Sequence, residues 1–167
     1  MTPLFDTILD YIPAPEGDAE APTQVLISTI DYNEYVGRIG VGKVDRGTIS
    51  VNQDVVIVNH HDPDKMRKVK VSRLYEFDGL NKVEVQSATI GSIVAISGIS
   101  DLHIGDTLCS PEAPDAIPFQ KISEPTISMQ FNVNDSPLAG TEGKFVTSRH
   151  LRDRLFRELN TDVSLRV

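Results

Sequence analysis

Short apolar segments separated by turn residues fill the chain between residues 23 and 110. The segments are rich in β-branched side chains, which favour strands, and they lie at 25–27, 35–36, 55–58, 69–71, 83–85 and 93–96. Turn residues stand between them at 45–47, 59–63, 78–79, 91–92 and 98–101. Gly37, Gly40 and Gly42 lie inside a strand pattern, where glycine usually marks a bulge or a bend. The pattern therefore predicts a mainly β fold with a small closed barrel over residues 23–110, because closure removes exposed strand edges.

The first 22 residues have a different pattern. Leu4, Ile8 and Ile12 recur at helical spacing, and Pro13 ends the period. Residues 13–22 are rich in proline and acidic residues, which is typical of an extended linker. A helix followed at once by a linker is an unusual start for a domain. We therefore expect residues 1–22 to be the last helix and linker of an upstream domain.

A second change of pattern follows residue 110. Residues 111–123 contain three prolines and are expected to be a linker. Apolar residues alternate over 126–133, as in a half-buried strand, and residues 148–159 form an amphipathic helical pattern that Thr147 or Ser148 can cap. Residues 163–167 resemble the start of another strand. The expectation for residues 124–167 is an incomplete α+β (ferredoxin-like) domain with the order βαβ, so that the chain has lost material at both ends.

Composition excludes several classes of protein. No apolar run approaches the ~18 residues that span a bilayer, so no membrane partner is expected. The N-terminus has no basic region of a secretory signal, because no Lys or Arg precedes Arg38. The single cysteine, Cys109, cannot form an internal disulfide. These features indicate a cytoplasmic protein.

The net charge of −8 conceals an uneven distribution. Residues 1–37 hold seven acidic residues and no Lys or Arg, so the remaining 130 residues are nearly balanced. Residues 65–73 carry five bases and no acid, and residues 144–167 carry six bases against three acids. Local basic surfaces can therefore meet phosphate although the whole chain is acidic.

One motif imitates a nucleotide site. Residues 37–43 fit the G-x-x-x-x-G-K pattern of phosphate-binding loops. That chemistry requires a Ser or Thr after the lysine for Mg²⁺ and a helix that opens at the lysine, but Val44 follows and the next residues have a strand–turn–strand pattern. A barrel hairpin is the better interpretation.

Other reactive side chains do not form a catalytic set in the sequence. His60 and His61 lie in a predicted hairpin tip and lack a distant partner set for a metal. His103 and His150 are isolated, and Cys109 has no neighbouring base. We expect no catalytic, cofactor-binding or metal-binding residue in this chain, which is therefore not itself an enzyme.

The basic run at residues 65–73 has two interpretations. In a strand, Val69 and Val71 would point inward while Lys68 and Lys70 project from the outer face. Several cations on one surface can neutralise a phosphate backbone. Lysines also protect strand edges from aggregation. Composition alone leaves both interpretations open.

Several segments resemble translational GTPases. Residues 37–49, 91–99 and 104–108 resemble the second-domain barrel that elongation factors Tu and G share. Residues 124–144 and 147–159 resemble the third domain of the TypA (BipA) family, and residues 3–9 and 12–15 resemble the exit from its GTPase domain. The resemblance covers essentially the whole chain. Asn160–Asp162 departs from it, because a more apolar approach to the next strand is expected there.

The resemblance implies a ribosome-binding fragment of a GTPase. It implies that the barrel contacts small-subunit rRNA and that the third domain relays the GTPase state. GTP and Mg²⁺ would bind an upstream domain outside this chain, and transfer RNA would be reached through later domains. Charge, rather than a matched family contact, selects the rRNA-contact candidates Lys65, Arg67, Lys68, Lys70, Lys144 and Arg149. The alternative is a stand-alone barrel that binds nucleic acid or protein as an adaptor.

Overall fold

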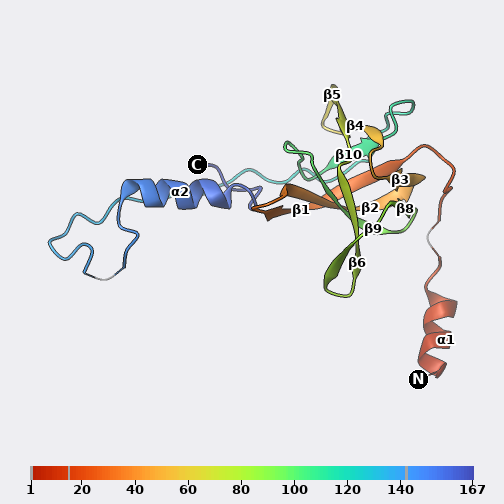
Figure 1. The fold of residues 1–167 in the computed structure, drawn as a ribbon, viewed down its shortest axis with the longest axis horizontal. Helices are drawn as coiled ribbons and strands as arrows, with labels where there is room; N and C mark the ends of the chain where they lie inside the picture. The colour runs from red at the N-terminus through yellow and green to blue at the C-terminus, as the bar shows by residue number, and fades with distance from the viewer. Residues whose placement is uncertain (1, 15, 142) are drawn as a thin grey trace. The chain divides into compact units, whose positions relative to one another are not determined.

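The computed structural model describes residues 2–14, 16–141 and 143–167. Contacts divide the chain into one unit up to Phe119 and a second unit from Gln120. Figure 1 shows the strands gathered in the first unit, which carries the candidate interface. No helix in the described ranges is both long enough and apolar enough to cross a membrane.

The first unit is built from antiparallel strands, as the sequence pattern predicts. The strands are β1 (Gln24–Asn33), β2 (Gly37–Arg46), β3 (Thr48–Ser50), β4 (Asp54–Asn59), β5 (Asp62–Lys70), β6 (Arg73–Asp78), β7 (Asn81–Glu84), β8 (Ser87–Thr89), β9 (Ile93–Ser97) and β10 (Asp106–Cys109). Eight of them form a sheet in the order β5-β4-β10-β1-β2-β9-β6-β7, and β3 pairs with β8 in a second small sheet. The mainly β prediction is confirmed.

Hydrogen bonding does not close this sheet. Its end strands are β5 and β7, and among the described residues they pair with β4 and β6 only. Isolated backbone bonds bridge the remaining distance: the Asn52 amide donates to the Val71 carbonyl at 2.8 Å, and the Val51 amide donates to the Gln86 carbonyl at 2.9 Å. The expected closed barrel is therefore not confirmed, because no ladder joins β5 to β7 in the described part of the chain.

The glycines of β2 bend the sheet as the sequence predicts. The register between β1 and β2 shifts between Ile27 and Thr29, opposite Gly42. A Cβ atom on Gly42 would lie 2.2 Å from the Leu26 carbonyl oxygen, so only glycine allows the two backbones to approach this closely.

Alternate residues of the strands form one apolar core. It contains Val25, Ile27, Val44, Ile57, Leu74, Val94, Ile96, Leu102 and Leu108, all at 0–1% exposure. Ile49 of β3 and Ala88 of β8 belong to the same core, so the small sheet packs against it. Burial of this set is the main source of stability for the unit.

The predicted N-terminal helix is present as α1 (Thr2–Tyr11), but it buries none of its residues. Leu4, Phe5 and Leu9 are 56%, 57% and 77% exposed. The following segment returns to the strands: the Gly47 amide donates to the Asp18 carbonyl at 2.9 Å, and the Arg46 side chain donates to the Pro22 carbonyl at 3.1 Å.

The described residues of the second unit contain one regular element. Helix α2 (Ser148–Glu158) is capped by Thr147, whose hydroxyl oxygen accepts from the His150 amide at 3.4 Å, as the sequence predicts. The strands predicted at 126–133 and 163–167 are wrong, since the described residues of this unit contain no strand. A strand needs a hydrogen-bonded neighbour, and these segments have none; Ile127 and Met129 are 84% and 75% exposed. The two segments lie near each other without pairing as strands: Arg166, in the second, forms an ion pair at 3.0 Å with Glu124, just before the first.

Truncation of a core leucine tests this description of the first unit. Leu74→Ala should lower the free energy of unfolding by about 2–5 kcal/mol, because it removes a fully buried side chain and leaves a cavity. Leu80→Ala is the matched control, since Leu80 is fully exposed and its truncation should change stability by less than about 0.5 kcal/mol. Urea denaturation followed by far-ultraviolet circular dichroism measures both; equal losses would contradict the assigned core.

Candidate nucleic-acid interface

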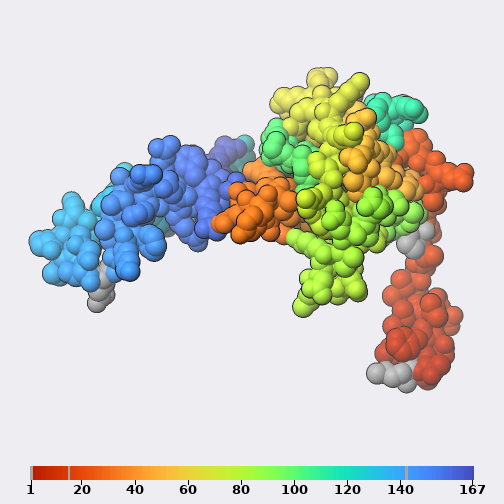
Figure 2. Space-filling model, viewed as in Figure 1, coloured from red at the N-terminus to blue at the C-terminus, as the bar shows by residue number. Residues whose placement is uncertain are grey.

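Residues 65–70 of the basic run form most of β5, an end strand of the large sheet that pairs with β4 alone among the described strands. Val69 lies opposite Val55 and packs against the core, while the next apolar residue, Val71, is fully buried. Lys68 lies opposite Val56, and Lys70 lies opposite Asp54. Because side chains alternate along a strand, both lysines share the outer face, as predicted. The β4–β5 hairpin forms part of the surface of the first unit (Figure 2).

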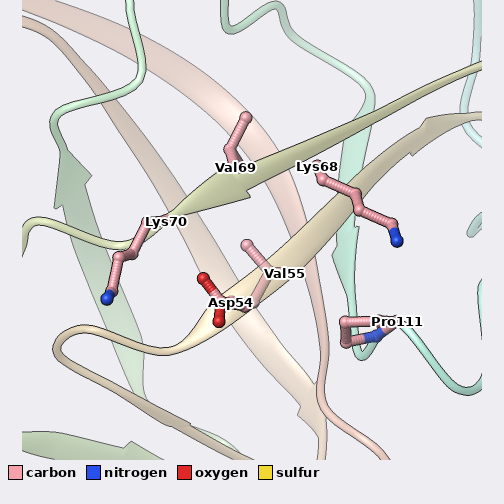
Figure 3. A pocket seen from close by; sticks show the side chains of 6 residues that line it. All are labelled: Asp54, Val55, Lys68, Val69, Lys70 and Pro111. Carbon is pink, nitrogen blue, oxygen red and sulfur yellow. The ribbon is translucent and has the colours of Figure 1, made fainter.

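The two lysines line a shallow hollow of about 470 Å³. Its lining residues are Asp54, Val55, Lys68, Val69, Lys70 and Pro111. Figure 3 shows the ammonium groups diverging from β5, with Asp54 between them and Pro111 on the side of Lys68. Both lysines are exposed, and no ion pair within 4.0 Å involves either of them in the described ranges. Their charges are thus available to an anionic partner, reduced by the Asp54 carboxylate between them.

Arg67 has the opposite strand parity to Lys68 and Lys70. Its side chain therefore starts on the inward face of β5 and extends to the end of the sheet. One guanidinium nitrogen contacts the Asp101 carboxylate, and another donates to the Asp101 carbonyl at 2.8 Å and lies 3.7 Å from a carboxylate oxygen of Asp106. Asp106 is almost completely buried and also accepts hydrogen bonds from the Asn59 amide group and the His103 backbone amide, each at 2.9 Å. The guanidinium therefore compensates a buried carboxylate inside the protein.

Lys65 is also engaged within the hairpin. Its ammonium donates to the Asp62 carboxylate at 2.7 Å, and this hydrogen bond raises the pKa of the Lys65 ammonium. The pair is exposed to solvent, so it contributes little to stability and can exchange for another anion.

The other two candidates lie in the second unit. Lys144 is exposed in the loop before α2, and Arg149 in the first turn of α2 forms a loose ion pair with Asp153 at 3.9 Å. The six predicted cations therefore divide between the two units, with four on the β4–β5 hairpin and two near α2. Their role in rRNA contact stays a prediction.

The G-x-x-x-x-G-K motif and the two adjacent histidines both lie in strands or hairpins of the first unit. Residues 37–43 lie within β2 and pair with β1, so the strand interpretation of the G-x-x-x-x-G-K motif is confirmed. His60 and His61 form the hairpin tip, as predicted, between the paired residues Asn59 and Asp62. Within the described part of the chain, no group of three or more His, Cys, Asp or Glu side chains is arranged to hold a metal.

The sequence alone did not predict the acidic partners of Arg67 or the part of Pro111 in lining the hollow. Asp101 and Asp106 follow Arg67 by more than thirty positions, and no local pattern connects them with it. The sequence pattern places Pro111 in a linker and gives no sign that it lines a hollow. A signal was present for the second case: four consecutive apolar residues at 55–58 indicate a strand that is covered on both faces.

Substitution by glutamine distinguishes Arg67, which contacts acidic groups of the fold, from Lys68, which is exposed. Arg67→Gln should lower the free energy of unfolding by about 1–3 kcal/mol, because the buried Asp106 carboxylate loses its nearby positive charge. Lys68→Gln should leave the urea midpoint unchanged. Equal midpoints for the two variants would contradict the role of Arg67 described above.

Comparisons with known proteins agree with this architecture. Residues 37–109 match the family described as elongation factor Tu domain 2. All 167 residues align with proteins named "Large ribosomal subunit assembly factor BipA": identity is 50% for Synechocystis sp., 45% for Bacillus subtilis and 47% for Escherichia coli K12. The chain covers 28%, 27% and 27% of these relatives, respectively, so it spans little more than a quarter of their length. With this identity along its whole length and an elongation-factor-Tu-type second domain, the chain belongs to the TypA/BipA family and corresponds to a segment of its members.

Proposed function

We propose that this chain is the ribosome-docking segment of a TypA/BipA-type translational GTPase. The observation that carries the proposal is 45–50% identity over the whole chain to proteins named as large ribosomal subunit assembly factors. The outer-face lysines of β5 supply a physical means of contact, because exposed ammonium groups on one surface bind a phosphate backbone.

Within the proposal, the β unit contacts rRNA through Lys68 and Lys70. These two lysines come first among the six candidates because Arg67 is engaged by Asp101 and Asp106, and Lys65 by Asp62. Lys144 and Arg149 form a second possible contact from the other unit. The proposed particle is the small subunit, the docking site that elongation factors of this type suggest.

GTP hydrolysis takes place elsewhere in the protein under this proposal. The one phosphate-loop-like motif of the chain is a β strand, so a domain outside these residues supplies the GTP and Mg²⁺ site. Residues 124–167 then relay the nucleotide state, which requires that their placement differ between the GTP-bound and GDP-bound protein. Contact with transfer RNA falls to domains beyond this chain, and the protein acts in the cytoplasm.

A stand-alone adaptor barrel is the competing function. It requires a protein that works without a GTPase domain. All 167 residues align with BipA relatives that are almost four times as long. This alignment favours the hypothesis that the chain is a segment of a larger factor.

Ribosome binding across a salt series tests the docking surface. The chain should bind purified small subunits with an affinity that falls as salt rises, and Lys68→Gln/Lys70→Gln should reduce the slope of log affinity against log salt by about 2. The control is Lys43→Gln/Lys121→Gln, which removes the same charge from other places; Lys43 lies on β2, four strands away from β5.

Sedimentation with labelled protein measures binding to small and large subunits in parallel. Equal losses in the two double variants would reject Lys68 and Lys70 as a specific contact. Preference for the large subunit would reject the small-subunit assignment, and absence of binding at low salt would reject docking through this segment.

A further inference from the structure

The segment after β10, residues 110–119, lies on the outer face of the large sheet and belongs to the first unit. We call it the strap. Its exposed residues include Glu112, Pro114 and Pro118, whereas Ala116, Ile117 and Phe119 are partly buried. The strap is anchored at its beginning by two hydrogen bonds between Ser110 and Thr23, of 2.9 and 3.0 Å.

The middle of the strap covers a second, small apolar cluster. Val56, Val58 and Cys109 are buried on the outer face, and Ala116 packs against them. The Cys109 thiol lies against the backbone of Asp115: it donates to the Asp115 carbonyl at 3.0 Å and accepts from the Asp115 amide at 3.4 Å. Burial raises the pKa of the thiol. The strap therefore covers the one cysteine of the chain.

Two further hydrogen bonds hold the strap to the strands beneath it. The Gln24 side chain donates to the Asp115 carbonyl at 2.8 Å, and the Ile117 amide donates to the Thr107 hydroxyl at 3.1 Å. Each of them joins a side chain to a backbone group, and no strand is assigned to the strap, so no β ladder fixes it in place.

Phe119 closes the far end of the strap. Its ring occupies the space where a Cβ on Gly105 would lie, within 2.0–2.3 Å of that position. The His61 ring packs edge-on against it with centroids 4.8 Å apart, and His61 Nε2 lies 3.1 Å from the Phe119 carbonyl oxygen. The Phe119 ring thus packs over Gly105 and against the His61 ring, beside the β4–β5 hairpin. We call these two contacts the latch.

We propose that the strap is a latched two-state element, which opens at Phe119 and swings about Ser110 while the core remains folded. Beyond Ser110 the strap is held by a few hydrogen bonds, the Arg46–Asp115 ion pair at 3.7 Å and the packing of Ala116 and Phe119, without strand pairing. Weak attachment of this kind is the condition for local opening below the cost of global unfolding. Opening exposes Cys109, so the strap controls access to the thiol.

The reaction rate of Cys109 with a thiol reagent measures this opening directly. The 167-residue chain in native buffer should react more slowly than the urea-unfolded chain by about a hundredfold or more. Phe119→Ala should accelerate native labelling roughly tenfold, because it removes the latch ring without touching the core. Thr107→Val, which removes the acceptor of the Ile117 amide, should accelerate it by about threefold.

The matched control is Phe77→Ala, which truncates a partly exposed ring on β6 and should leave the labelling rate unchanged in native buffer. Labelling at low urea concentrations distinguishes local from global opening, since a local opening depends only weakly on denaturant. A Phe119→Ala rate equal to that of the wild-type chain would overturn the proposal, as would rates that follow global unfolding at all urea concentrations.

Discussion

Burial of β4 on both faces is the constraint on which the rest of the first unit depends. Val55 and Ile57 point into the main core, and Val56 and Val58 point into the outer cluster under the strap. Strand β4 is the only pairing partner of β5 in the described sheet, so its position fixes the register of every cation on the basic strand. Loss of packing on either face of β4 would therefore disturb the core, the strap and the candidate interface together.

Strand parity then decides which of the basic residues can meet a partner. A clustered charge in sequence suggests one surface, but alternation sends neighbouring residues to opposite faces. Arg67 shares the parity of Ile57 and ends beside the buried Asp106, whereas Lys68 and Lys70 share the parity of Val56 and reach solvent. The basic run thus supplies an ion pair within the fold and two exposed cations from adjacent positions. Arg67 therefore has a role within the fold, and for Lys68 and Lys70 phosphate binding stays a prediction beside protection of the strand edge.

The sequence predicts what depends on local pattern and fails where the partner is distant. Alternation and glycine placement identified the β unit, the bend at Gly42 and the strand nature of residues 37–43, because these properties depend on residues close in sequence. The cap at Thr147 is local in the same way. The acceptors of Arg67 were not predictable, since Asp101 and Asp106 reach it only through tertiary packing. The strap was missed because proline content indicated a linker, although the apolar run at 55–58 required a second cover.

The same physical reasoning explains why the two units of the chain differ. The first unit buries alternate residues of its strands between paired neighbours, so its pattern and its structure agree. In the second unit, residues 126–133 have an equally regular alternation, but their apolar side chains remain exposed because no strand pairs with them. Alternation shows that a segment suits a strand; a partner is still needed to satisfy its amides and carbonyls. Helix α2 forms without such a partner because its hydrogen bonds are internal, which is why it is the one regular element among the described residues of its unit.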